Sequence, residues 1–422
     1  MNIWLSTIGQ RLNDAENTRT MLLASALIKR HHKVTLWTSA FDHIQKQWHP
    51  EWVEYGRSPI IKDDGLVVRF IKGCGYQRNI SFRRFLDHHL AARDLWAQAT
   101  EAEKPDVAIA SLPDHITART MVALGKELGF PVILDVRDKW PHIFIDYAPR
   151  ILKPVARLLL AREIAETRRA LSSADNVVSM MQSLIDWSRE IGTRIHFEHD
   201  KVFFLATTKE TQFDDFAPSD LPDAIRNLLT SADKPFTFCF IGTFNKTQHP
   251  ALVLNAIDLL RKKTNLVSDN VAFLIGGDGI DAEVVKRRAA EVENVHFLGW
   301  LRPRQIQAVL SRSDVGLLPM NFASEAFNNK AFAYLASGLP IINCAVGDLR
   351  QLIDDERIGV NVDAGNPQAL AQAMHQLLSD RSATREMSAR VKNLYSKRFN
   401  QEKVYEDYAA HVELIAGAGR AR

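Results

Sequence analysis

The chain has 422 residues, and its 53 Lys and Arg residues nearly balance 50 Asp and Glu residues, giving a formal net charge of +3. A hydrophobic share of 46% excludes a disordered chain, and 20 Gly with 16 Pro residues exclude a collagen-like fibre. The length argues for two domains or more, and the small net charge gives no reason to expect a nucleic-acid partner.

The three cysteines, Cys74, Cys239 and Cys344, are far apart in the sequence. They form neither a disulfide framework nor a Cys-x-x-Cys metal signature, which fits a reducing compartment. Residues 1–8 lack the basic start of a signal peptide, and no run of about 18 apolar residues occurs. We therefore expect a cytoplasmic protein, soluble or at most peripheral at the inner face of the cytoplasmic membrane.

Strands and helices alternate through the first half, which predicts βαβ units and a parallel sheet. The expected strands are 2–6, 34–38, 66–72, 106–111, 131–136 and 176–179. The expected helices are 18–30, 81–103, 117–127 and a long helical stretch from about 150 to 171.

The composition changes between residues 205 and 235, where acidic residues and prolines replace the apolar periodicity. We interpret this segment as the link into a second domain. After it, strands are expected at 236–241, 271–275, 295–298, 315–319 and 340–343, and helices at 250–262, 282–291, 304–312 and 329–337. The predicted organisation is α/β, with two doubly wound domains at 1–205 and 206–398 and a final helical segment at 399–422.

Open parallel sheets bind ligands at the carboxyl ends of their strands, so the loops that follow the strands are the candidate site. The GGDG sequence at 276–279 allows a tight turn and close approach of a ligand to the backbone, but its spacing is not the dinucleotide fingerprint. A plain turn between strand and helix is an equal alternative. In the GTFNK loop at 242–246, Lys246 faces either a phosphate or only solvent.

The segment EAFNNK at 325–330 precedes an expected helix. Free backbone N–H groups at a helix start favour an anion, and Lys330 adds a positive charge there. Glu325 supplies a carboxylate that can accept hydrogen bonds from sugar hydroxyls. Simple helix capping is the alternative, but the clustering of Glu, two Asn and Lys favours a diphosphate site.

Several segments, in this order and spacing, resemble retaining GT-B glycosyltransferases, most of all the family-four enzymes of bacterial O-antigen and capsule assembly. They are IGGDG at 275–279, FLGW at 297–300, SDVGLLP at 313–319, NKAFAYLASGLP at 329–340 and GDLRQLI at 347–353 with Gly359. In the first half, WTSAFDH at 37–43 and VRDKWP at 136–141 look like the same subgroup. The likeness covers nearly the whole chain.

The resemblance implies two Rossmann-like domains facing each other across a cleft, with an NDP-sugar (UDP- or GDP-sugar) held by the C-terminal domain. It implies an acceptor on the N-terminal domain, and retaining transfer without a metal or other cofactor. It also implies that the C-terminal helix at 399–422 packs back on the N-terminal domain. The sequence contains no Asp-x-Asp motif and no zinc spacing. Without a metal, the leaving-group charge must be met by helix starts and cationic side chains, a need that Lys330 fits.

Under this resemblance, Glu325 and Lys330 are catalytic candidates, the first holding the sugar and the second the diphosphate. The candidate donor contacts are Gly242, Thr243, Lys246, Gly277, Asp278, Ala326, Phe327, Asn328, Asn329 and Ala333. Ala333 departs from the family pattern Glu-x7-Glu. In the family, the second glutamate stands at this position and its carboxylate bonds to the hydroxyls of the donor ribose. Loss of such a bond costs roughly 1.5–3 kcal/mol. The departure is a natural variant, an engineered change or a sign of weakened catalysis.

The acid/base residue is left open by the sequence. His115 and Asp138 are the two candidates, with a helix-start histidine and an ion pair to Arg137 or Lys139 as their structural alternatives. An enzyme of this type needs no protein base where the departing phosphate takes the proton. Candidate acceptor contacts are Gly9, Asp42 and His43. For Asp42 and His43, the first interpretation is that they are surface turn residues.

Basic residues interleave with leucines between 150 and 169, and Arg78, Arg83 and Arg84 form a second basic group. The first pattern predicts a basic amphipathic helix that either buries one face in the core or docks on an anionic membrane carrying a lipid-linked acceptor. The leading hypothesis is a transferase of surface polysaccharide synthesis that acts on a lipid-linked or oligosaccharide acceptor. The alternatives are a sugar-nucleotide epimerase or phosphorylase of the same fold, and a catalytically weakened structural subunit.

Overall fold

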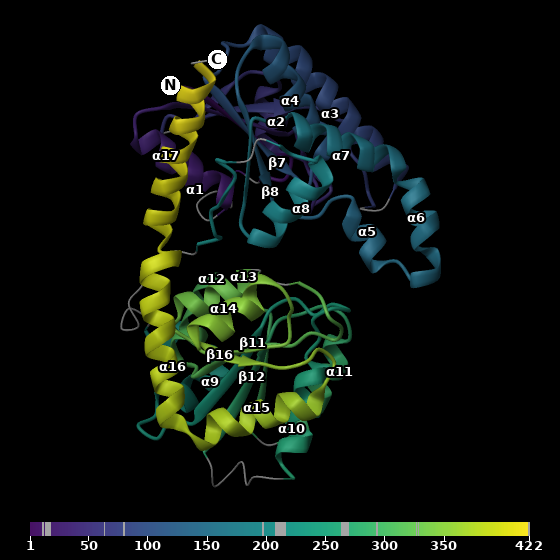
Figure 1. Cartoon of the computed structure of the whole chain (residues 1–422). Helices are drawn as coiled ribbons and strands as arrows, with labels where there is room; N and C mark the ends of the chain where they lie inside the picture. Colours follow the sequence, from purple (N-terminus) through teal and green to yellow (C-terminus); the bar gives the residue numbers. More distant parts are fainter. Residues whose placement is uncertain are drawn as a thin grey trace. The chain divides into compact units, whose positions relative to one another are not determined.

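The computed structural model describes residues 1–10, 12, 18–62, 64–78, 81–195, 198–206, 217–262, 270–292, 294–325, 327 and 329–420. The chain forms two compact units (Figure 1). Unit 1 comprises Met1–Phe204 together with Glu402–Arg422, and unit 2 comprises Leu205–Gln401. Within the expected link, residues 207–216 lie outside the described residues, and α9 (Asp223–Thr230) belongs to unit 2.

Unit 1 is built on an eight-stranded sheet with the order β10-β9-β8-β7-β1-β2-β6-β5. Its strands are β1 (Asn2–Ser6), β2 (Lys33–Ser39), β5 (Ile60–Ile61), β6 (Val67–Ile71), β7 (Val107–Leu112), β8 (Val132–Val136), β9 (Asn176–Ser179) and β10 (Lys201–Val202). All neighbours are parallel except β5 and β6. Each strand that the sequence predicts for this half is present, whereas β5 and β10 have two residues each and are too short for the pattern to indicate.

Helices lie on both sides of this sheet, with α1 and α17 on one side and α3, α4 and α7 on the other (Figure 1). The helices of unit 1 are α1 (Arg19–Lys29), α2 (Pro50–Tyr55), α3 (Phe82–Glu101), α4 (His115–Leu128), α5 (His142–Tyr147), α6 (Lys153–Leu159), α7 (Ala161–Ser173), α8 (Gln182–Gly192) and α17 (Gln401–Arg420). A short hairpin of β3 (Phe41–Asp42) and β4 (Gln47–Trp48) extends from the end of β2.

The stretch expected to be helical from about 150 to 171 is helical, but it is not one continuous helix. The chain forms a 3-10 turn (Arg150–Leu152), α6 and α7 instead. Pro154 stands in the first turn of α6, where a proline removes no intrahelical hydrogen bond, so a new helix starts there. The backbone leaves helical geometry again at Leu160, where ψ is 5°.

A buried ion pair ties the first and last helices of unit 1 to its sheet. Arg19 on α1 donates from Nε to both carboxylate oxygens of Asp135 on β8, at 3.1 and 2.9 Å. Its Nη1 also donates to the carbonyl oxygen of Phe203, and its guanidinium lies 5.2 Å from the ring centre of Tyr408 on α17. Burial alone would raise the pKa of Asp135, but the charges of Arg19 and Arg137 outweigh it and lower the pKa. The pair therefore stays ionised inside the unit.

Unit 2 is built on a six-stranded parallel sheet with the order β13-β12-β11-β14-β15-β16. Its strands are β11 (Phe236–Ile241), β12 (Val271–Gly276), β13 (Val295–Gly299), β14 (Val315–Leu318), β15 (Ile341–Asn343) and β16 (Gly359–Asn361). The first five match predicted strands. Continuous apolar runs such as FTFCFI in β11 fit strands that are covered on both faces.

The helices of unit 2 cover both faces of that sheet, with α12, α13 and α14 on one side and α10 and α15 on the other (Figure 1). They are α10 (Ala251–Leu260), α11 (Ala282–Ala290), α12 (Pro303–Arg312), α13 (Asn329–Ala336), α14 (Asp348–Glu356), α15 (Pro367–Ser379) and α16 (Arg381–Leu394), besides α9. Within the described part of the chain, no helix is both long enough and apolar enough to cross a membrane.

Candidate functional site

The strand order of unit 2 places a topological switch point between β11 and β14. From β11 the chain adds β12 and β13 on one side and then returns to add β14, β15 and β16 on the other. Ligands of open parallel sheets bind outside the strand ends at such a point. The loop that begins at Gly242 leaves β11 there, and α13 follows the loop that leaves β14.

Two glycine-bearing loops interlock at this edge of the sheet. The backbone N–H of Phe244 donates to the carbonyl oxygen of Asp278 at 2.8 Å, and that of Ile280 donates to the carbonyl oxygen of Phe244 at 3.1 Å. Gly277 has φ 138°, and a Cβ there would overlap the carbonyl oxygen of Gly242. Close packing of the loops therefore requires glycine at 277, whatever ligand it contacts.

Lys330 places a poorly solvated positive charge at the switch point. Its side chain runs so close to Gly242 that a Cβ on that glycine would lie 2.5 Å from the lysine Nζ. The same Nζ lies 5.2 Å from the ring centre of Phe240, the residue before the last of β11. Desolvation lowers the pKa of Lys330 from 10.5 to about 8, so the amine is largely charged at neutral pH. Such a charge attracts an anion.

Helix α13 is anchored so that Lys330 is held at this place. The hydroxyl of Tyr334 donates to the carbonyl oxygen of Leu317 on β14 at 3.1 Å and accepts from the N–H of Ile241 on β11 at 3.4 Å. A Cβ on Gly316 would lie 2.6 Å from the ring of Tyr334, so the helix can sit against the strand only because that residue is glycine. One side chain thus fixes the helix across the switch point.

Glu325 lies beside the start of α14. It forms an isolated parallel bridge with Val346, and a Cβ on Gly347 would lie 2.9 Å from its Cγ. Gly347 is the N-cap residue of α14, and its φ of 80° suits glycine. The carboxylate is exposed, as the sequence-based role in holding sugar hydroxyls requires.

The remaining donor candidates divide between open surface and core. Thr243, Lys246, Asp278 and Asn329 are exposed, and Ala333 is half-buried one helical turn beyond Lys330. The side chain of Phe327 is buried and stacks on Phe332 at 4.5 Å, so it serves packing and only its backbone can face a ligand. Ala326 and Asn328 lie outside the described residues.

The acid/base candidates lie in unit 1. His115 is the first residue of α4, is buried, and bonds through Nε2 to the carboxylate of Glu163 on α7. That hydrogen bond lowers the pKa of Glu163. Asp138 is half-buried and accepts from the N–H of Lys139 at 2.8 Å, and burial raises its pKa. The alternative ion pair with Arg137 is not formed, because that arginine bonds to Asp135.

The acceptor candidates lie in the segments that follow β1 and β2. A Cβ on Gly9 would lie 3.1 Å from the ring of His43, so the two residues are in contact. Asp42 is buried and accepts from the N–H groups of Ile44 and Gln45 at 2.7 and 2.9 Å. Its carboxylate therefore closes a turn, as the structural alternative predicts, but the residue is buried and is not at the surface.

The structure brings Gly242, Lys330 and the GGDG loop together, and Glu325 joins the same edge through the loop after β14. These residues belong to unit 2, whereas the acid/base candidates His115 and Asp138 belong to unit 1. Analysis of the sequence missed Lys46, Trp48 and Tyr76, which line a basic pocket of unit 1. The available signal was the neighbouring basic group at Arg78 and Arg83.

Among the described residues, no group of three or more His, Cys, Asp or Glu side chains is placed to hold a metal ion.

Comparison with solved structures defines the class of the fold. The chain superimposes on a protein from Anabaena, Alr3699/HepE, solved in complex with UDP, with a TM-score of 0.68 and 13% identity over 98% of this chain and 99% of that one. The fold is therefore GT-B, with two Rossmann-like domains, as the sequence predicts. Residues 235–380, which lie within unit 2, match the family model described as "Glycosyl transferases group 1".

Two curated relatives are similar in sequence. A D-inositol 3-phosphate glycosyltransferase of Geodermatophilus obscurus is 24% identical over 294 residues, which is 67% of this chain and 65% of the relative. An O-antigen chain mannosyltransferase C of Escherichia coli is 23% identical over 175 residues, 40% of this chain and 44% of the relative. The matched segments thus span less than two thirds of these relatives' own length.

We predict that the desolvated charge of Lys330 lowers the free energy of unfolding of unit 2. Lys330→Met keeps the aliphatic packing and removes a desolvated charge, so we expect the free energy of unfolding of unit 2 at pH 7 to rise by roughly 1–3 kcal/mol. Between pH 8 and 10.5, Lys330 is protonated in the unfolded chain but largely neutral in the folded one. The stability gained by Lys330→Met should therefore shrink across that range and vanish above it. Scanning calorimetry at pH 7 and pH 10.5 measures both.

Lys286→Met on α11 is the matched control, because Lys286 is exposed. We expect it to change the stability of unit 2 by less than about 0.5 kcal/mol at either pH. A Lys330→Met protein that is less stable than the wild type at pH 7 would contradict the desolvated-charge account.

Proposed function

We propose that the protein is a retaining glycosyltransferase that moves a sugar from an NDP-sugar held by unit 2 to a lipid-linked or oligosaccharide acceptor held by unit 1. The observation that carries this proposal is the desolvated ammonium of Lys330 against Gly242, at the switch point of a group 1 glycosyl transferase domain. A diphosphate is the anion that such a charge and the nearby helix start fit. The sugar it carries would then extend toward Glu325.

In the proposed reaction, the bond between the anomeric carbon and the diphosphate oxygen breaks, and the acceptor oxygen bonds to the same face of the sugar. The proton of the acceptor hydroxyl passes to the departing phosphate oxygen, so the reaction needs no cofactor to take up that proton. The negative charge that develops on the diphosphate is stabilised by Lys330 and by N–H groups at the start of α13. Glu325 accepts hydrogen bonds from the sugar hydroxyls and so fixes its orientation.

The names of two relatives support the acceptor class that we propose. One relative is a D-inositol 3-phosphate glycosyltransferase and another an O-antigen chain mannosyltransferase. Both names describe transfer to hydroxyl-rich acceptors, and the second supports a role in bacterial surface polysaccharide synthesis. UDP in the Anabaena structure supports a UDP-sugar as the first donor to test, with a GDP-sugar as the other.

Ala333 favours a second candidate function, a structural subunit with weakened catalysis. The side chain lies one turn from Lys330, where a glutamate could reach the ribose of a nucleotide, and alanine offers no hydrogen bond. The two functions differ in a simple way. A transferase binds nucleotide and turns over, whereas a structural subunit does neither at useful concentrations.

A membrane-facing role for α6 supports the lipid-linked acceptor. Five apolar side chains of the 3-10 turn and α6 are between 51% and 85% exposed, namely Ile151, Leu152, Val155, Leu158 and Leu159. In the described part of the chain, the interleaved Arg150, Lys153 and Arg157 form no ion pair. These helices lie at the edge of unit 1 far from α17 (Figure 1). We propose that this surface inserts into an anionic membrane at the cytoplasmic side.

Nucleotide binding tests the donor site. We expect either UDP or GDP to raise the melting temperature of the wild type, because a ligand that binds only the folded state adds about 2.7 kcal/mol at a hundredfold excess over its Kd. Lys330→Met should abolish the shift. Ala333→Glu should increase it, because the new carboxylate can bond to ribose hydroxyls. If no nucleotide shifts any of the three proteins, the transferase proposal fails and the structural subunit takes its place.

Vesicle binding tests the surface of α6. The double variant Leu158→Ser with Leu159→Ser should bind vesicles containing phosphatidylglycerol at least about tenfold more weakly than the wild type, since burying one leucine contributes roughly 1.5–3 kcal/mol. Cosedimentation measures this, and neutral phosphatidylcholine vesicles should retain little protein. Leu414→Ser, at an exposed leucine of α17, is the control and should bind like the wild type. Equal binding by all three proteins would rule out docking through α6.

A further inference from the structure

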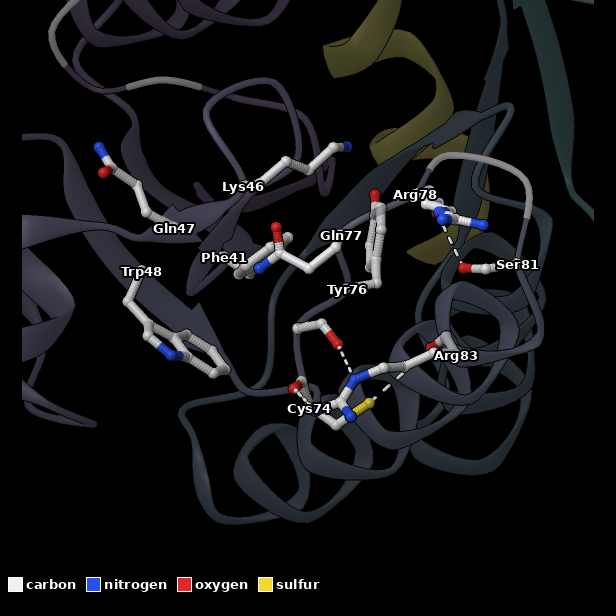
Figure 2. A pocket seen from close by; sticks show the side chains of 11 residues that line it. Phe41, Lys46, Gln47, Trp48, Cys74, Tyr76, Gln77, Arg78, Ser81 and Arg83 are labelled. Atoms are coloured by element: carbon white, nitrogen blue, oxygen red, sulfur yellow. Dashed lines mark hydrogen bonds between the residues drawn. The ribbon is translucent and has the colours of Figure 1, made fainter.

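The basic pocket of unit 1 has a volume of about 640 Å³, and its Lys46 bonds to the carbonyl oxygen of the acceptor candidate His43. It is bounded by the β3–β4 hairpin on one side and by the chain leading into α3 on the other (Figure 2). Trp48 stands on one side of the opening, and Arg78 with Ser81 stands on the opposite side. A volume of this size accommodates a saccharide unit.

The charged residues that line the pocket are all basic: Lys46, Arg78 and Arg83. Arg83 is fixed by two carbonyl groups, donating from Nε to Gly75 at 2.7 Å and from Nη2 to Cys74 at 3.1 Å. Among the described residues, neither Arg78 nor Arg83 forms an ion pair. No described carboxylate therefore neutralises the charges of Arg78 and Arg83.

A third arginine, Arg84, adds to this field although it is not one of the lining residues. The ammonium of Lys46 lies 4.6 Å from the ring centre of Tyr76, and the guanidinium of Arg84 lies 5.8 Å from the same centre. Burial and the charge of Arg84 lower the pKa of Lys46. Three carboxylates act on Tyr76 from nearby. Asp87 accepts from the N–H of Gly75 at 2.6 Å, Asp114 accepts from the N–H of Thr117 at 3.4 Å, and Asp42 closes its own turn.

The base of the pocket is aromatic and held in place by its own packing. Phe41 contacts Trp48 edge-on at 5.5 Å and Tyr76 at 5.2 Å between ring centres. Phe41 and Tyr76 are buried, whereas Trp48 is half-exposed and offers ring surface to the pocket. Gln47 and Gln77 add amide groups that can bond to hydroxyls. Aromatic surface with a few polar groups is typical of a small-molecule site.

We propose that this pocket binds an anionic saccharide, its phosphate or carboxylate contacting Lys46, Arg78 and Arg83 and its sugar ring lying against Trp48. The assignment rests on the proposed function, in which unit 1 holds the acceptor, and it specifies the chemical class of that acceptor. An arginine can bind either kind of anion through two parallel hydrogen bonds, so the pocket chemistry is shared by sugar phosphates and uronic acids.

The test is calorimetric titration of the whole protein with three probes: glucose 1-phosphate, methyl glucuronide and the neutral methyl glucoside. We expect at least one anionic probe to bind and the neutral one to bind at least about tenfold more weakly, because charge-assisted bonds are lost. The anionic probe that binds more tightly shows whether the pocket prefers a phosphate or a carboxylate. Equal binding of the neutral probe, or no binding of either anion, overturns the proposal.

Variants locate the binding and separate it from the donor site. Arg78→Gln and Lys46→Gln should each lower the affinity for the anionic probe by about tenfold or more. Arg93→Gln, at an exposed position of α3 outside the pocket, should leave that affinity unchanged. All three should respond to nucleotide like the wild type. If nucleotides bind normally while Arg78→Gln and Lys46→Gln bind the probe like the wild type, the pocket assignment fails and the proposed function stands. If no nucleotide stabilises the wild type, the proposed function fails together with the acceptor role.

Discussion

A positive charge that water solvates poorly is the feature on which the candidate site depends. The aliphatic part of Lys330 packs over Gly242, and its ammonium lies near the face of Phe240, so desolvation brings its pKa down to about 8. Holding such a group costs stability, and proteins keep such costs mostly where binding or catalysis requires them. A side chain at position 242 would occupy the space of the lysine, so the charge and the glycine depend on each other.

The rest of unit 2 keeps that arrangement rigid. Tyr334 bonds to both β11 and β14, so α13 cannot slide relative to the switch point. The loop containing Gly277 packs against the Gly242 loop through backbone contacts that exclude a Cβ. Preorganised charge of this kind stabilises a leaving group without rearrangement during the reaction. Unit 1 has its own central constraint in the buried pair of Arg19 and Asp135, which helps to join α17 to the sheet of that unit.

The sequence predicted the strands well, because buried parallel strands are continuous apolar runs with glycine-rich loops at their ends. The GT-B class came instead from the resemblance of motifs such as 275–279 and 329–340 to that family. Its periodicity could not show that the helix from 150 is broken, since Leu160 is as apolar as its neighbours and only its backbone angle differs. Side-chain roles were harder to predict. Phe327 proved to be packed against Phe332, and Asp42 closes a turn, facts that depend on contacts distant in sequence or on local geometry. The basic pocket was missed because Lys46 and Arg78 meet only in the folded unit.

The most direct test of the central claim is the pH dependence of nucleotide affinity between pH 7 and 10, for the wild type and for Lys330→Met. The ammonium is charged below its pKa of about 8 and neutral above it, so the account predicts that wild-type affinity is highest near pH 7 and falls as the pH rises. Lys330→Met should bind weakly with a flat profile. A wild-type profile that is flat, or one that Lys330→Met reproduces, would contradict the assignment of Lys330 to the diphosphate.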